Sequence, residues 1–332
     1  MCRFNLALYR TKQAGRLRGI KLDKELKEVV ALRSKVDPCL YELCHPVHGP
    51  VFILVNVEDL IVAGEKLAGN AAVKRSVSAI FEVRDIGEVN DFIGMKVTRD
   101  REAKTLALSN PGHTATLLEV FGMQNFTPNK APMASAVKLT KTSEDLLPED
   151  NRYAALVGSL LYLSSTTRLN IDFAVGVLSL LISCPGHDHV RAKKGVSRYL
   201  RGTTRLGVVY GGSEPLQGFS DAHWAGDVDG RRSTTRFVFT RNGGPIAWAS
   251  KPQSTVATLT AEEEYVAAAM ATKKALWLRK LLSALAVDGG AVPIGEDNQA
   301  CLPWSSTPKP PSVPRTWTSR TTWCMNTWRA GR

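Results

Sequence analysis

The chain has 332 residues, with 43 Lys and Arg against 31 Asp and Glu and a formal net charge of +12. A hydrophobic content of 44% and a charged content of 22% are typical of globular proteins and exclude wholesale disorder. No apolar run is long enough to cross a membrane, and no apolar signal segment follows Met1. We therefore expect an intracellular protein, cytoplasmic or nuclear and not secreted, with no membrane partner.

The excess positive charge is concentrated at the two ends of the sequence. Residues 1–35 contain ten Lys and Arg and three acidic residues, and residues 302–332 contain five Lys and Arg and no acidic residue. The segment between them is neutral overall. A basic balance of this kind suggests nucleic acid as the partner.

The first part of the sequence predicts helices and hairpins. Residues 21–31 have helical spacing, with apolar positions on one face. A β-branched run over 51–57, two acidic residues and a second apolar run over 60–63 predict a hairpin with two carboxylates at its tip. We also expect a helix over 70–81 and a second hairpin over 93–108 that turns near 101–104.

The second part of the sequence predicts a helical segment followed by an α/β layer. Polar, turn-rich stretches at 128–132 and 142–150 are typical of linkers. Three antiparallel strands, a long helix and a further strand then follow, with acidic residues at strand ends. The predicted helices span 154–166, 171–183, 190–201 and 261–285, and the strands span 219–224, 234–240, 245–250 and 292–294.

The adjacent acidic residues Glu58 and Asp59 form one candidate site. Paired carboxylates at a strand tip can bind a divalent metal that supports phosphoryl transfer. Two acidic residues at a hairpin tip are more often part of a solvated turn. On spacing alone, the second interpretation is favoured.

Three acidic residues in the second part form another candidate site. Asp221 ends a predicted strand, Glu264 lies in the first turn of the long helix, and Asp297 follows the last strand. Two-metal hydrolysis of a phosphodiester needs several carboxylates that converge from separate elements. Three unrelated surface acids are the alternative, and the residue pattern alone favours this alternative.

Eight short motifs, which occur in a fixed order along the chain, help to decide between a metal site and unrelated surface acids. Together they resemble the C-terminal part of the Pol polyprotein of copia-type (Pseudoviridae) LTR retrotransposons, from the end of the reverse transcriptase through the connection to RNase H. The similarity runs from about Asn5 to Ala300. The motifs are DPCLY (Asp37–Tyr41), EDLIVAG (Glu58–Gly64), VGSLLYL (Val157–Leu163), RYLRGT (Arg198–Thr203), FSDAHWAGD (Phe219–Asp227), RRSTT (Arg231–Thr235), TAEEEYVA (Thr260–Ala267) and DNQA (Asp297–Ala300).

The resemblance implies an α/β (α+β) fold: a partial reverse transcriptase palm and connection, followed by an RNase H-like mixed sheet with helices. Residues 1–135 would form the partial reverse transcriptase, with a palm remnant and a thumb-like region. Residues 136–210 would form the connection, and residues 215–301 an incomplete RNase H-like domain.

The resemblance also implies a role for the second acidic group. Asp221, Glu264 and Asp297 stand at the metal-binding carboxylates of RNase H, so Mg²⁺ is the expected cofactor. Glu264 is preferred to Glu262 because it directly precedes Tyr265, as the family's helix requires. The implied partners are an RNA–DNA hybrid or other nucleic acid, and the rest of the Gag-Pol polyprotein.

In the first part, Glu58 and Asp59 stand at the paired aspartates of the family's Tyr-Val-Asp-Asp polymerase motif, with Asp59 as a metal ligand. Lys12 and Gln13 fall in an element that lies near the template and the incoming nucleotide. The motif here reads Asn56-Val57-Glu58-Asp59, and the added methylene of Glu58 moves a carboxylate beyond the tolerance of a two-metal site. The family's other catalytic aspartate would precede Met1. We therefore expect no polymerase activity.

The family pattern changes in two further places. Arg168-Leu169-Asn170 replaces an Arg-Pro-Asp sequence. After Ala300 the resemblance stops, and residues 302–332 hold four of the seven tryptophans. Residues 323–327, reverse-translated and read in a shifted frame, give Val-His/Tyr-Glu-His/Tyr, so we predict that the tail at 302–332 is out of frame.

A shifted tail would remove the fourth RNase H carboxylate. With three of the four carboxylates present, we expect little or no nuclease activity. The alternatives are a non-catalytic nucleic-acid-binding remnant and an unexpressed fossil gene product.

Overall fold

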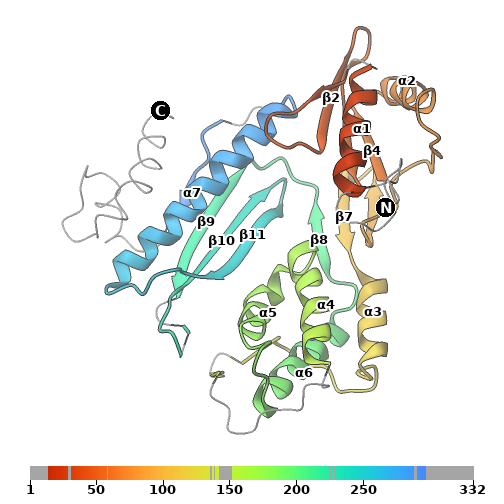
Figure 1. Ribbon diagram of the computed structural model, residues 1–332. Helices are drawn as coiled ribbons and strands as arrows, with labels where there is room; N and C mark the ends of the chain where they lie inside the picture. Colours follow the sequence, from red (N-terminus) through yellow and green to blue (C-terminus); the bar gives the residue numbers. More distant parts are fainter. Residues whose placement is uncertain are drawn as a thin grey trace, which may run out of the picture. The chain divides into compact units, whose positions relative to one another are not determined.

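The computed structural model describes residues 14–28, 31–57, 59–134, 137, 139–141, 152–223, 226–227, 229–287 and 290–296. The fold is mixed α/β, with several sheets and helices, which confirms the predicted class. The chain divides into two compact units: residues 1–89 with 277–290, and residues 90–276 with 291–332. Each unit is described by itself (Figure 1).

The first unit is a four-stranded antiparallel sheet with two helices. The strands lie in the order β1-β2-β3-β4, and the predicted hairpin is confirmed as β3 and β4, with Asn56 paired to Asp59. Its buried core includes Leu26, Ile53 and Val73. The elements are α1 (Ala14–Glu28), β1 (Leu32–Arg33), β2 (Leu40–His45), β3 (Gly49–Asn56), β4 (Asp59–Gly64) and α2 (Leu67–Ser78).

Two features of this unit differ from the prediction. The first helix covers Ala14–Glu28 rather than 21–31, and Ala31 lies outside it. Strand β2 was not predicted at all. Its first two residues, Leu40 and Tyr41, are both buried, so its sequence lacks the alternation of apolar and polar residues that marks a half-buried strand.

The second unit contains a helical core and a sheet that joins distant parts of the sequence. Leu160, Val175 and Leu200 are fully buried where the helices pack together. In the sheet β5-β6-β7-β8, β8 pairs antiparallel with β7, although almost one hundred residues separate them. The elements are β5 (Asp91–Phe92), β6 (Met95–Asp100), β7 (Thr105–Ser109), α3 (Pro111–Val120), α4 (Tyr153–Thr166), η1 (Leu169–Ile171), α5 (Asp172–Ser179), α6 (His187–Gly202) and β8 (Gly207–Tyr210).

The same unit holds the predicted α/β layer, apart from residues 277–284 of its long helix, which belong to the first unit. Its sheet has the order β11-β10-β9-β12: β9, β10 and β11 are antiparallel, and β12 runs parallel to β9. Figure 1 shows α7 alongside this sheet, and Gln253 Nε2 donates to Glu263 O over 2.9 Å. This confirms the predicted order of three strands, a helix and a strand. The elements are β9 (Gln217–His223), β10 (Thr234–Arg241), β11 (Gly244–Pro252), α7 (Thr260–Ala284) and β12 (Ile294–Gly295).

Several predictions concern residues outside the described part of the chain. They include Lys12, Gln13, Glu58 and Asp297, the linker at 142–150 and the tail at 302–332. Among the described residues, no helix combines the length and the apolar character that a membrane span requires.

Candidate carboxylate site

Asp221 lies on β9, an interior strand of the C-terminal sheet. Its partner in the antiparallel register is Arg236 of β10, and Arg236 Nη1 lies 3.7 Å from Asp221 Oδ2. The Arg236 guanidinium also stacks over the Phe173 ring, 4.4 Å from its centroid, and its buried Nε atom has no hydrogen-bond partner among the described residues. Asp221 therefore faces a positive charge that is built into the fold.

The first turn of α7 buries three consecutive glutamates. Glu262 accepts hydrogen bonds from Thr258 N at 2.8 Å and Thr258 Oγ1 at 3.0 Å, so its carboxylate holds the start of the helix. Glu264 has a different environment: its side chain is buried, and its Oε2 atom has no hydrogen-bond partner among the described residues. Of these two glutamates, Glu264 is the one with unused ligand capacity.

Glu264 and Asp221 are electrostatically coupled. Burial, followed by the negative charges of Glu296 and Asp221, raises the pKa of Glu264 to about 8. A carboxyl group with such a pKa holds a proton at neutral pH because burial and the neighbouring carboxylates both disfavour its ionised form. The structure thus brings together two of the three predicted ligands.

Two carboxylates near this pair were not singled out from the sequence. Glu296 directly follows β12, and it accepts a hydrogen bond from Ser220 Oγ at 2.6 Å. Glu263 is buried, and its Oε2 atom has no hydrogen-bond partner among the residues that the structure describes. Its pKa is raised by burial and by Asp221, against the opposing effects of Ser233 and His223. The position of Glu296 next to Asp297 at a strand end was the sequence signal that could have revealed it.

The chemistry of this group suits a hard divalent cation. Carboxylate oxygens are the ligands that Mg²⁺ prefers, and the buried Oε2 atom of Glu264 has no hydrogen-bond partner within the described part of the chain. Within the described ranges, no three His, Cys, Asp or Glu side chains are arranged as a metal site. Of the three predicted ligands, Asp221 and Glu264 lie within the described ranges, and Asp297 lies outside them.

Of the predicted polymerase residues, the structure describes Asp59 alone. Asp59 is exposed and begins β4, directly after the hairpin turn. Its predicted neighbours Glu58, Lys12 and Gln13 lie outside the described residues. Asp59 is therefore the one member of this predicted group that lies within the described part of the chain.

Comparisons with known proteins place these features in a family. The family model described as reverse transcriptase (RNA-dependent DNA polymerase) matches residues 1–135. The Pol polyprotein of transposon TNT 1-94 from Nicotiana tabacum is 36% identical over 309 residues, which are 91% of this chain and 23% of that protein. A secreted RxLR effector protein of Plasmopara viticola is 46% identical over 128 residues, covering 38% of this chain and 90% of the effector.

The chain belongs to the family of copia-type retrotransposon Pol polyproteins and corresponds to a reverse transcriptase-like segment of them. It spans about a fifth to a quarter of the length of the polyproteins that it matches. A foamy viral protease-reverse transcriptase, solved in complex with dsDNA, is 14% identical with a TM-score of 0.49, covering 97% of this chain and 57% of the viral one.

Proposed function

We propose that residues 215–301 form an RNase H-like domain that binds Mg²⁺ through Asp221, Glu264 and Asp297. We further propose that the chain binds an RNA–DNA hybrid and cleaves it little or not at all. The observation that carries the proposal is the burial of Glu264, whose Oε2 atom has no hydrogen-bond partner among the described residues, beside Asp221 and Glu296. A fold gains nothing from gathering like charges unless a cation or a proton compensates them.

The chemistry that Mg²⁺ supplies in such a site is activation of water and stabilisation of the leaving 3′ oxygen. The protein's own contribution is to hold the carboxylates in place. Strand β9 fixes Asp221, the first turn of α7 fixes Glu264, and the Ser220 hydroxyl orients Glu296. Separate elements are needed because one segment of chain cannot surround a cation.

Two observations support weak turnover. The Arg236 guanidinium already neutralises part of the Asp221 charge, so a cation gains less by binding there. The sequence after Ala300 also departs from the family pattern where a fourth carboxylate is expected. Both features weaken metal binding without removing the fold that surrounds the site.

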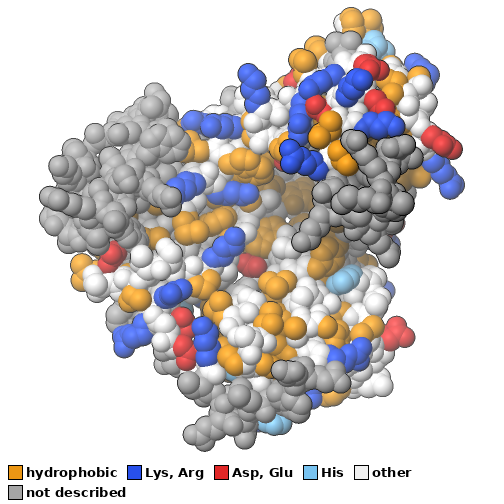
Figure 2. Space-filling view, viewed as in Figure 1, with side chains coloured by type: hydrophobic (Ala, Val, Ile, Leu, Met, Phe, Trp, Pro, Cys, Tyr) orange, Lys and Arg blue, Asp and Glu red, His pale blue; other side chains and the backbone are white. Residues whose placement is uncertain are grey.

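Nucleic acid is the proposed partner because of the family and the charge. The chain carries an excess of Lys and Arg, and on the face shown in Figure 2 these side chains cover more of the described surface than Asp and Glu do. A cationic surface attracts the phosphates of any strand, largely regardless of sequence. For the polymerase motif we propose no activity, because Glu58 replaces an aspartate.

The test is an assay of the whole chain with a labelled RNA–DNA hybrid in the presence of Mg²⁺. We expect salt-dependent binding of the hybrid, with RNA cleavage at or near background. Cleavage at the rate of an intact RNase H, lost in Asp221→Asn, would overturn the proposed impairment. If the hybrid does not bind at low salt, the proposed partner is wrong.

A further inference from the structure

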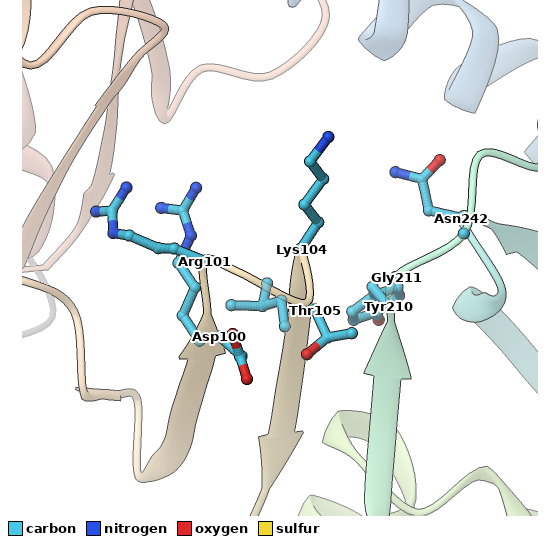
Figure 3. Close-up of a pocket in the computed structure, with 10 residues that line it drawn as sticks. Asp100, Arg101, Lys104, Thr105, Tyr210, Gly211 and Asn242 are labelled. Atoms are coloured by element: carbon cyan, nitrogen blue, oxygen red, sulfur yellow. The ribbon is translucent and has the colours of Figure 1, made fainter.

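A pocket of about 560 Å³ lies in the second unit, away from the residues of the carboxylate site. Three segments form its walls: the turn between β6 and β7, the end of β8, and the turn between β10 and β11. Arg99, Arg101 and Lys104 line one side, while Tyr210 and Asn242 belong to the other segments (Figure 3). A volume of this size is in the range of small-molecule sites and exceeds the needs of a single ion.

The charges around this pocket are separated by the geometry of the first turn. Figure 3 shows the Lys104 and Arg101 side chains extending toward the open side, whereas the Asp100 carboxylate points the other way. Asp100 Oδ1 accepts hydrogen bonds from Glu102 N and Ala103 N, both at 2.9 Å, so this carboxylate closes its own turn. Among the described residues, Arg99 and Lys104 form no ion pair. Arg99 and Lys104 are therefore two cations at this pocket that no described carboxylate neutralises.

Lys104 adopts a backbone conformation that is unfavourable for lysine. Its φ angle is +53°, in the left-handed region that glycine and asparagine occupy at lower cost. The residue closes a four-residue hairpin loop, where glycine would form the same turn without strain. A strained residue whose side chain projects into a pocket is a reason to look for a role of that side chain.

The wall opposite Lys104 is held by hydrogen bonds of its own. Asn242 and Gly243 have φ angles of +51° and +77°, the pattern of a tight hairpin turn. Asn242 O accepts from Gly211 N at 3.0 Å and from Gly212 N at 3.1 Å, and Tyr210 OH donates to Pro245 O at 2.8 Å. The backbone carbonyl groups of Asn242 and Pro245 are thus already hydrogen-bonded, while the Asn242 side-chain amide faces the same opening as Lys104 (Figure 3).

We propose that this pocket binds a phosphate group of a nucleic acid strand, together with part of the attached nucleoside. Lys104 and Arg99 would contact the phosphate oxygens, and the Asn242 amide would donate a hydrogen bond from the opposite wall. Phosphate is the anion that Lys, Arg and amide donors bind in concert. The proposal rests on the proposed function for its partner, nucleic acid, and adds a contact separate from the carboxylates.

A nucleotide phosphate could come from a strand or from a free nucleotide. We favour the strand because the pocket is open on the side to which the cations point, and because the chain belongs to a family of Pol polyproteins. The two sources are distinguished by competition: a mononucleotide that displaces a labelled oligonucleotide at micromolar concentration would show that the free nucleotide is the ligand.

The experiment measures binding of a fluorescent RNA–DNA hybrid to the whole chain, in EDTA, over a range of salt concentrations. Lys104→Gly and Lys104→Gln are compared with Lys130→Gln, which removes an exposed lysine outside the pocket. We expect both Lys104 variants to reduce the slope of log K against log salt by about 0.9, the value for one lost phosphate contact. Lys130→Gln should leave the slope unchanged.

Thermal unfolding of the same variants separates binding from folding. Lys104→Gly should unfold at the same temperature as the wild type or higher, because glycine relieves the backbone strain, and it should still bind the hybrid less well. Hybrid binding by Lys104→Gly and Lys104→Gln equal to that of the wild type would overturn the proposal. Because EDTA removes divalent cations, this comparison does not depend on metal binding at the carboxylate site. If the wild type itself does not bind the hybrid, that result would count against the proposed function instead.

Discussion

The two candidate acidic sites of this chain show how the same residue types acquire different properties. Both aspartates are exposed, but Asp59 begins a strand just after a hairpin turn, whereas Asp221 lies on an interior strand beside the buried glutamates of α7. The family motif marks both positions. The difference indicates that convergence of separate elements, rather than a pair of acids at a hairpin tip, creates the electrostatics of a cation site. In the described residues, only the second site has that convergence.

The largest expected effect is that of pH on Mg²⁺ binding at the second site. Because the pKa of Glu264 is about 8, most of its carboxyl is protonated at pH 7 and most is ionised at pH 9. Mg²⁺ requires the ionised form, so the apparent affinity should rise about tenfold between these pH values. Calorimetric titration at several pH values measures this. A pH-independent affinity would separate Glu264 from the metal.

Stability should change with pH in the opposite direction. Between about pH 4.5 and pH 8, the unfolded chain has released the Glu264 proton while the folded protein still holds it. The free energy of unfolding is therefore highest below about pH 4.5, with respect to this group, and falls as the pH rises toward 8. Glu264→Gln cannot ionise. Its unfolding temperature should therefore exceed that of the wild type by a margin that grows from pH 5 to pH 8. A margin that stays constant would contradict the assigned pKa.

A smaller effect is expected from the built-in cation. Replacing Arg236 with Gln removes the positive charge that lies 3.7 Å from Asp221, so Mg²⁺ should bind about two- to fivefold more tightly. Arg236→Lys keeps the charge and serves as the matched control, with affinity near that of the wild type. The same titration measures both variants. Weaker binding in Arg236→Gln would show that Arg236 supports the site rather than opposes it.

The smallest expected effect concerns a buried cation outside both sites. Arg168 is almost fully buried, burial lowers its pKa, and its Nε donates to Asn170 Oδ1 over 3.3 Å. Asn170→Asp would restore the acidic residue of the family pattern and replace a neutral acceptor with a charged one. The unfolding temperature should rise by about 2–4 °C, as for a gain of about 1 kcal/mol. Leu169→Pro, the other departure in this motif, would not supply a charge.

Much of the C-terminal layer could be predicted from the sequence because its strands and helix have strong local signals. The turn at Asn242-Gly243 and the buried face of α7 are examples. Strand β8 could not be predicted in the same way. It is four residues long, and its partner β7 is distant in sequence, so only the tertiary fold shows that Gly207–Tyr210 completes a sheet.

The candidate site was predictable in part for a similar reason. The family motifs singled out Asp221 and Glu264 as candidates, and the position directly before Tyr265 favoured Glu264 over Glu262. Arg236 was not identifiable, because its contact with Asp221 depends on the register of two strands joined by a long loop. The burial of Glu263 likewise depends on how α7 packs, which a row of three glutamates does not reveal.

The central claim is that the chain binds Mg²⁺ at the second acidic site and not at the first. Calorimetric titration of Mg²⁺ at pH 8.5 into the wild type, Asp221→Asn and Asp59→Asn tests it directly. We predict that Asp221→Asn weakens binding at least tenfold and that Asp59→Asn binds as the wild type does. Equal affinities for all three proteins, or a loss confined to Asp59→Asn, would contradict it.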